Sequence, residues 1–278
     1  MTPFQILLPA FVVSLILTGI HAYLGVHVVE RGVIFVDLSL AQIAALGLTV
    51  AYLAGYDIHT SHQAYLFSLG FTFIGAAIFA FTRTHRKTRI PQEAIIGIVY
   101  AVSAAVAILL MSKATQETEH LKEMLVGNIL SVTWFDIGKT AVLYALVGVF
   151  HFVFRRKFLL ISMDEPEAER QGVNVRFWDF LFYMSFGFVV TSSVAIAGVL
   201  LVFCFLIVPS VAAMLFSERL GVRLAIGWTM GAVVSAGGVA LSFVLDLPTG
   251  ATIVATFGAA LLLLAAYRAL FFFRAAVT

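Results

Sequence analysis

Long runs of hydrophobic residues, separated by short polar segments, make up most of the chain. They lie at about 4–26, 33–54, 64–82, 94–112, 133–154, 178–196, 198–216, 224–245 and 250–273. The hydrocarbon core of a membrane is about 30 Å thick, so a helix needs about 20 residues to cross it. Runs of this length are too long for barrel strands, and backbone groups in lipid must pair within their own segment. The pattern therefore predicts an all-α, polytopic transmembrane bundle of about eight or nine spanning helices.

The longest uncharged stretch, Phe180 to Ser217, contains 38 residues. This is about twice the length that one crossing needs. We therefore expect two helices, joined by a tight turn near 192–198.

Small residues recur at four-residue spacing in the run 224–245, at Gly227, Gly231 and Ser235. Residues four apart lie on the same face of a helix. Small side chains let two helix backbones approach closely in a membrane. We expect this face to pack against another helix of the same chain.

The composition supports a membrane protein. Hydrophobic residues make up 62% of the 278 residues, charged residues 12%, and the mean hydropathy is +1.04. Soluble domains carry about 25% charged residues, so the composition excludes an ordinary soluble enzyme, a disordered chain and a nucleic-acid-binding domain. The single cysteine, Cys204, excludes an intrachain disulfide and a cysteine-based metal motif. The first run lacks a basic leader and a small-residue cleavage site, so we expect a span rather than a cleaved signal.

The distribution of basic residues predicts the orientation in the membrane. Alternate loops hold 14 of the 17 Lys and Arg residues: Arg31, Arg83, Arg86, Lys87, Arg89, Arg155, Arg156, Lys157, Arg170, Arg176, Arg219, Arg223, Arg268 and Arg274. The other loops hold only Lys113 and Lys122, with Lys139 at the end of a span. Because cytoplasmic loops are enriched in Lys and Arg, we expect an outer N-terminus and a cytoplasmic C-terminus.

Motifs for catalysis are absent from the sequence. It has no Walker-type phosphate loop, no HExxH and no Ser/His/Asp arrangement with usable spacing. We therefore expect no catalytic residue and no ATP hydrolysis by this chain alone.

The second hydrophobic run contains a carboxylate, Asp37, followed by Ser39 and Gln42 in FVDLSLAQIAALG. An ionisable group inside a span is costly and marks a candidate functional site. One interpretation is that Asp37 lines a substrate path and contacts a passing cation there. The equal alternative is a structural ion pair with Arg31 or an interfacial anchor. Asp37 and Gln42 lie about 140° apart around a regular helix, so they do not share a face.

The segment 155–176, RRKFLLISMDEPEAERQGVNVR, is the longest predicted cytoplasmic loop. Its basic flanks enclose an acidic centre. Asp164 is suited to cap a short helix with Pro166 in the first turn, and Gly172 is suited to end it. A short capped helix on such a loop is a candidate docking element for a soluble partner, and a solvated loop is the simpler alternative.

The loop GYDIHTSH carries Asp57, His59 and His62 on the predicted outer side. Carboxylate and imidazole groups attract divalent cations. Scattered polar residues on a solvated loop are also common without any ligand.

Several segments together resemble the membrane permease subunits of ATP-binding-cassette transporters for zinc, manganese and iron uptake. They are LGVHVVERGVIFVDLSLAQIAALG (24–47), EAIIGIVYAV (93–102), LVGNILSVT (125–133), MDEPEAERQGV (163–173), AGVLLVFCFLIVPSVAAMLF (197–216) and LDLPTGATIV (245–254). The resemblance covers nearly the whole chain and implies one permease domain, 1–278, in the bacterial cytoplasmic (inner) membrane.

The resemblance implies a transporter with several partners. Two copies would form a homodimer with the path between them, an ATP-binding subunit would hydrolyse ATP, and an extracytoplasmic protein would deliver the metal. The chain itself would bind no cofactor, and the divalent metal would be its cargo. The ATPase would contact the 163–173 loop, at Asp164, Glu165, Pro166, Glu167, Ala168 and Gly172.

One departure from the family bears on the substrate. The family's second span carries an Asp followed four residues later by a His. If Asp37 is taken as the family's Asp, the fourth residue after it is Ala41. If the alignment is instead fixed on Gly47, Gln42 takes the position of the His and Leu38 that of the Asp. An amide is a poor ligand for Zn²⁺ and suits harder ions such as Mn²⁺ better. A metal chelate or another solute is an alternative cargo.

Two other classes compete with this interpretation. A membrane-embedded enzyme would need paired catalytic groups at similar depth, and His21, Asp37 and His151 are the candidates. A channel or secondary transporter would need no ATPase, so co-purification of an ATPase would discriminate against it.

The orientation gives the first testable prediction. A Gly55→Cys variant should react with a membrane-impermeant thiol reagent in intact spheroplasts, because the 55–62 loop is predicted to face outward. Reaction only after lysis would overturn the orientation.

Overall fold

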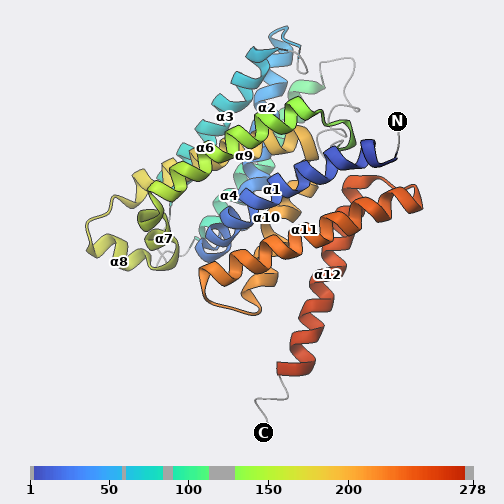
Figure 1. Ribbon diagram of the computed structural model, residues 1–278. Helices are drawn as coiled ribbons and strands as arrows, with labels where there is room; N and C mark the ends of the chain where they lie inside the picture. The colour runs from blue at the N-terminus through green and yellow to red at the C-terminus, as the bar shows by residue number, and fades with distance from the viewer. Residues whose placement is uncertain (1–2, 58–60, 84–89, 113–128, 273–278) are drawn as a thin grey trace. The chain divides into compact units, whose positions relative to one another are not determined.

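The computed structural model describes residues 3–57, 61–83, 90–112 and 129–272, and within these ranges the chain is almost entirely helical, with no strand (Figure 1). The helices are α1 Pro3–Arg31, α2 Val36–Leu53, α3 His62–Phe81, α4 Gln92–Met111, the 3-10 turn η1 Ile129–Ser131, α6 Trp134–Val153, α7 Arg155–Met163, α8 Glu165–Arg170, α9 Val175–Ala197, α10 Val199–Met214, α11 Leu220–Leu245 and α12 Thr249–Phe272. This confirms the all-α class.

Eight helices within the described ranges are long and apolar enough to cross a membrane. They are α1, α2, α3, α4, α6, α9, α11 and α12. The apolar helix α10 is shorter, at 16 residues. The expectation of about eight or nine spanning helices is therefore confirmed, whereas the orientation of the termini stays a prediction.

The uncharged stretch 180–217 does form two helices, α9 and α10. They meet at Gly198, which has a φ of 77°. Side chains other than glycine rarely adopt such a backbone conformation, so glycine makes the abrupt junction possible. The break lies at the C-terminal edge of the predicted turn region.

The described residues divide into two compact units. The first comprises 3–29, 129–144 and 196–272, and the second comprises 30–57, 61–83, 90–112 and 145–195. Each unit is assembled from separate stretches of the chain. The single permease domain expected for 1–278 stays a prediction.

Glycines set the closest helix contacts in the first unit. A Cβ on Gly25 of α1 would overlap the carbonyl oxygen of Leu206 in α10, and one on Gly231 of α11 would overlap Thr18. The hydroxyl of Ser210 donates to the carbonyl of Ala22 at 3.2 Å. The expected packing face on α11 is confirmed at Gly231, where α11 meets α1.

Helix α2 packs against both α3 and α4 in the second unit, and most of its residues are buried. A Cβ on Gly47 would come within 2.7 Å of the carbonyl oxygen of Phe67. The hydroxyl of Ser68 on α3 donates to the carbonyl of Ala44 at 3.1 Å. Near the start of the same helix, Asp37 and Ser39 are both buried.

The glycine contacts give the second prediction. Gly25→Ala should destabilise the protein by about 2 kcal/mol or more, because the new methyl group meets backbone that cannot rotate away. Gly19→Ala on the same helix is the matched control, since a Cβ there meets nothing within 4 Å. It should raise stability slightly, by up to about 1 kcal/mol. Thermal unfolding in detergent measures both, and equal midpoints for the two variants would contradict the packing argument.

Candidate functional site

The short helix α8 begins as the sequence predicts. The carboxylate of Asp164 accepts a hydrogen bond from the backbone N–H of Glu167 at 3.1 Å, and Pro166 occupies the first turn. A helix of six residues is too short to be stable alone. Its cap and its packing must therefore hold it in place.

The end of α8 also follows the prediction. Gly172 has a φ of 71°, and its N–H donates to the carbonyl of Glu169 at 2.9 Å. The N–H of Val173 donates to the carbonyl of Ala168 at 3.0 Å. This pair of hydrogen bonds is the Schellman arrangement that ends a helix at a left-handed glycine.

Ala168 faces the interior of this segment. It is fully buried and packs with Ile161 of α7 and Val175 of α9. The predicted contact between Ala168 and a partner therefore needs correction, because no partner reaches this side chain while α8 keeps its position. Asp164, Pro166 and Gly172 are exposed, whereas Glu165 and Glu167 are half-buried.

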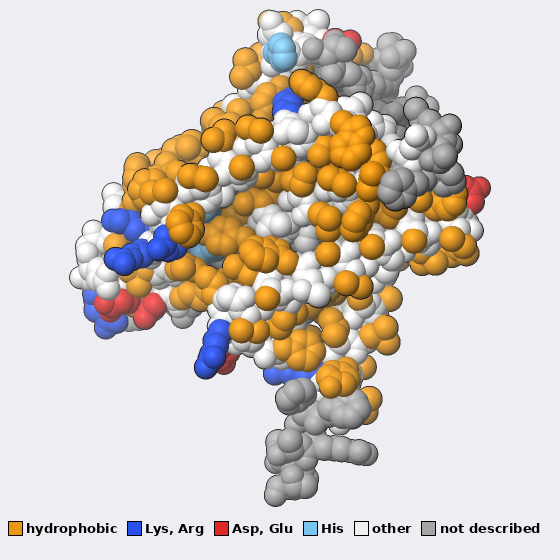
Figure 2. All heavy atoms as spheres, viewed as in Figure 1, with side chains coloured by type: hydrophobic (Ala, Val, Ile, Leu, Met, Phe, Trp, Pro, Cys, Tyr) orange, Lys and Arg blue, Asp and Glu red, His pale blue; other side chains and the backbone are white. Residues whose placement is uncertain are grey.

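The surface around α7 and α8 is charged. Lys, Arg, Asp and Glu side chains gather over this end, whereas hydrophobic side chains cover much of the rest of the visible face (Figure 2). Helix α8 carries an exposed ion pair between Arg170 and Glu167, 2.7 Å apart. The segment 155–176 thus offers a mixed-charge surface on a short, well-defined helix.

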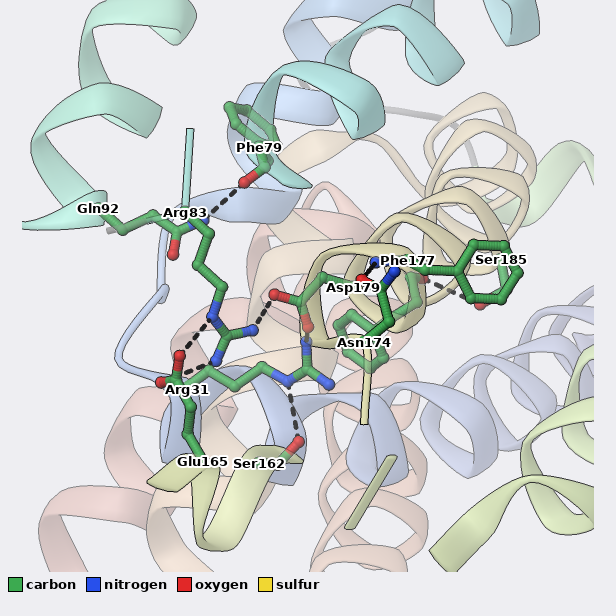
Figure 3. A network of polar contacts seen from close by, with 11 residues as sticks. Arg31, Phe79, Arg83, Gln92, Ser162, Glu165, Asn174, Phe177, Asp179 and Ser185 are labelled. Carbon is green, nitrogen blue, oxygen red and sulfur yellow. Dashed lines mark hydrogen bonds and ion pairs between the residues drawn. The ribbon is translucent and has the colours of Figure 1, made fainter. Parts of the chain in front are cut away.

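A buried ion network lies beneath α8, centred on Asp179 of α9 (Figure 3). Arg31 donates to one oxygen of Asp179 at 2.7 Å, and Arg83 donates to the other. Arg83 also holds Glu165 of α8 with two contacts of 3.0 and 3.1 Å. Arg31 donates to the hydroxyl of Ser162 in α7 at 2.8 Å.

This network changes the interpretation of Arg31. An ion pair between Arg31 and Asp37 was one expectation from the sequence, and in the structure Arg31 pairs with Asp179. Its guanidinium also lies 4.0 Å from the centre of the Phe182 ring. Asp179 was missed from the sequence, although an acidic residue inside the predicted span 178–196 marks a candidate functional site.

A cavity of about 380 Å³ opens beside α8 and the start of α9. Its lining combines both charge signs with backbone: Arg83, Glu165, Glu169, Gly172, Val173, Asn174, Val175 and Arg176. Arg83 and Glu165 therefore belong both to the buried network and to a surface that a partner can reach.

Asp37 lies in the first turn of α2 and is only 2% exposed. Among the described residues, its Oδ1 has no hydrogen-bond partner, and neither has the hydroxyl of the fully buried Ser39. Gln42 is half-buried. A buried carboxylate oxygen without a partner is costly, so Asp37 is the strongest candidate for contact with a cation or a proton.

A second carboxylate, Glu93, lies in the first turn of α4. Its Oε1 accepts a hydrogen bond at 2.9 Å from the N–H of Phe35, the residue that caps α2. Within the described ranges its Oε2 has no hydrogen-bond partner, and its charge acts on Asp37. Sequence reasoning missed Glu93 because it stands just before the predicted span 94–112.

The predicted outer residues are only partly described. Asp57 and His62 are exposed, and His59 lies outside the described residues. The described ranges contain no group of three or more His, Cys, Asp or Glu side chains that could hold a metal ion.

The two histidines weighed for an enzyme have local partners. His21 Nδ1 lies 2.7 Å from the carbonyl oxygen of Leu17. His151 Nε2 lies 2.8 Å from the hydroxyl of Ser185, and its ring stacks on Phe158. These contacts account for both side chains as parts of helix packing.

The sequence pattern of the ABC 3 transport family matches residues 3–268. The chain belongs to this family. It is 28% identical over 251 residues to the manganese transport system membrane protein MntC of Listeria innocua, covering 88% of this chain and 84% of that protein. It is 26% identical over 252 residues to the chelated iron transport system membrane protein YfeC of Yersinia pestis, covering 90% and 82%.

Solved structures share the fold of this ABC 3 family member. PsaBC from Streptococcus pneumoniae in complex with Fab superposes with a TM-score of 0.74 at 24% identity, covering 94% of this chain and 91% of that one. An inward-facing putative metal-chelate type ABC transporter gives a TM-score of 0.71 at 22% identity, covering 96% and 89%.

The family match confirms the resemblance seen in the sequence. With eight apolar helices in its described part, the chain is a multi-pass permease subunit of an ABC transporter in the bacterial inner membrane. Membership of a transport family also agrees with the expectation that the chain is not itself an enzyme.

Proposed function

We propose that this permease imports a divalent metal ion with oxygen-preferring chemistry, Mn²⁺ or Fe²⁺, as part of an ATP-driven complex. The observation that carries the proposal is the buried Asp37, whose Oδ1 has no partner among the described residues of a transport-family protein. Relatives named for manganese and for iron transport support the same class of cargo.

Asp37 and Glu93 form the proposed cation-contacting pair. Each has one oxygen without a hydrogen-bond partner in the described ranges, and α2 packs against α4. Asp37 is buried and Glu93 partly buried, and two such carboxylates repel each other unless a cation or proton compensates their charge. Oxygen ligands favour hard divalent ions, and the absence of an imidazole at Gln42 makes Zn²⁺ the weaker candidate.

Ser39 and Gln42 take lesser roles in this proposal. Ser39 is two residues from Asp37, so its side chain points about 200° away around a regular helix. Gln42 lies about 140° away. They meet the same ion only if a second copy of the chain contributes its own side chains, as a homodimer with a shared path would allow.

The energy comes from a separate ATP-binding subunit. The capped helix α8 is its proposed docking element, because α8 presents exposed charges on a fixed backbone. A binding protein outside the membrane delivers the metal, and the exposed Asp57 and His62 flank the segment that would meet it. The chain itself needs no resident cofactor.

The docking role gives the third prediction. Replacing Glu167 and Glu169 together by Lys should reverse the charge of α8 and reduce ATPase retention about tenfold or more, a loss of roughly 1.4 kcal/mol. Affinity purification of the co-expressed complex measures this retention.

Glu218→Lys is the matched control for docking, since Glu218 is an exposed acid between α10 and α11. It should retain the ATPase as the wild type does. Full retention by the α8 double variant would show that the docking assignment is wrong. Ala168 is unsuitable for this test, because a larger side chain there would disturb the segment's own packing.

The path role gives the fourth prediction. Asp37→Asn keeps the shape of the side chain and removes its charge, so uptake of radioactive Mn²⁺ should fall about tenfold or more, an effect of roughly 1.4 kcal/mol. Expression and assembly should stay normal.

Asp246→Asn is the matched control for this path role, because Asp246 is exposed and its φ of 52° suits asparagine. Poor expression of Asp37→Asn would favour a structural role, and uptake at the wild-type rate would eliminate the path role. Uptake of chelated iron but not of free ions by the wild type would identify a chelate as the cargo.

A further inference from the structure

Asp179 is a single buried carboxylate shared by two arginines from different parts of the chain. Its side chain is fully buried, and those of Arg31 and Arg83 are only 2% and 9% exposed. Glu165 balances the second positive charge and is 15% exposed. Two cations and two anions thus form one connected set, in which each carboxylate pairs with an arginine (Figure 3).

Each member of this network comes from a different structural element. Arg31 ends α1, and Arg83 follows the end of α3. Ser162 lies on α7, Glu165 on α8 and Asp179 on α9. The two short helices are therefore tied to three longer helices through contacts that converge on one carboxylate.

The geometry of these contacts opposes sliding of α8 relative to α9. Arg83 contacts both oxygens of Glu165 with its planar guanidinium while it also reaches Asp179. Bidentate arginine–carboxylate contacts fix orientation as well as distance. Buried ion pairs add little net stability compared with well-packed apolar residues, and their best-supported use is to specify one geometry.

The network also has an accessible edge. Arg83 and Glu165 line the cavity beside α8, whereas Asp179 is fully buried behind them. A subunit docked on α8 therefore lies next to the outer ion pair of the network. Any displacement of α8 has to move Arg83 or break its contact with Glu165.

We propose that Asp179 is a positioning residue for energy coupling: it holds Arg31 and Arg83 so that displacement of α7 and α8 moves α1 and α9. This role rests on the proposed function as an ATP-driven permease. The helices α1 and α9 are suited to pass on such movement, because each extends from the network as one continuous helix, of 29 and 23 residues. Glu165 provides the partly exposed contact to Arg83, and Asp179 provides the fully buried one.

The experiment compares metal transported per ATP hydrolysed in the reconstituted complex of permease, ATPase and binding protein, with Mn²⁺ as cargo. Asp179→Asn should leave ATPase retention unchanged, because the exposed surface of α8 keeps its charges. ATP hydrolysis should continue while the transport-to-hydrolysis ratio falls at least about tenfold, equivalent to 1.4 kcal/mol of lost coupling.

Two further variants separate positioning from simple destabilisation. Arg83→Lys keeps the charge, but a single ammonium group cannot reproduce the fork that holds two carboxylates, so the ratio should fall here too. Asp179→Glu keeps the charge at the centre and should restore part of the ratio. Asp246→Asn removes an exposed charge that belongs neither to the network nor to α8, and it should leave the ratio unchanged.

The outcomes distinguish this proposal from the proposed function. A wild-type complex that hydrolyses ATP without moving metal would contradict both the proposed function and the coupling role. Wild-type transport with an unchanged ratio in Arg83→Lys and Asp179→Asn would overturn the coupling role alone, as would a parallel fall in transport and hydrolysis. If Asp179→Asn fails to assemble, Arg83→Lys alone decides the question.

Discussion

The structure depends on one constraint: the hydrocarbon interior of a membrane offers no hydrogen-bond partner to the backbone. Each spanning segment must pair its own N–H and C=O groups, and the helix is the solution that a single segment can reach. The same constraint acts on side chains. The hydroxyls of Ser14, Thr49 and Ser193 each donate to the carbonyl four residues earlier in their own helix. Each of these hydroxyls therefore has a hydrogen-bond acceptor within its own helix.

Association of the helices then depends on shape more than on hydrophobicity, because lipid tails are as apolar as leucine. Close approach is possible where a side chain is missing, as at Gly25 against α10 and at Gly47 against α3. Ser210 adds a polar link, since its hydroxyl lies within hydrogen-bond distance of carbonyls on both α1 and α10. Asp37, in the first turn of α2, is only 2% exposed.

Charged side chains inside the protein differ from these hydroxyls, and they differ from one another in how their charge is compensated. Asp179 has two guanidinium partners, so its charge is matched within the protein. Asp37 keeps an oxygen without a hydrogen-bond partner among the described residues, and so does Glu93. A matched charge serves to fix geometry, whereas an unmatched one favours a passing cation or proton. The proposed path role of Asp37 and the proposed positioning role of Asp179 rest on this contrast.

The lengths of the hydrophobic runs and the positions of the charged residues between them determined where the helices lie. The spacing of neighbouring residues determined the cap and the end of α8, because capping involves residues only a few positions apart. The sequence also marked Asp37 as an ionisable group inside a span. Only the tertiary structure decided that Ala168 faces inward, that Glu93 reaches the start of α2, and that Arg31 pairs with Asp179, 148 residues away. The physical reason is that a side chain finds such partners through the packing of distant helices, and neither hydrophobic period nor local spacing encodes that packing.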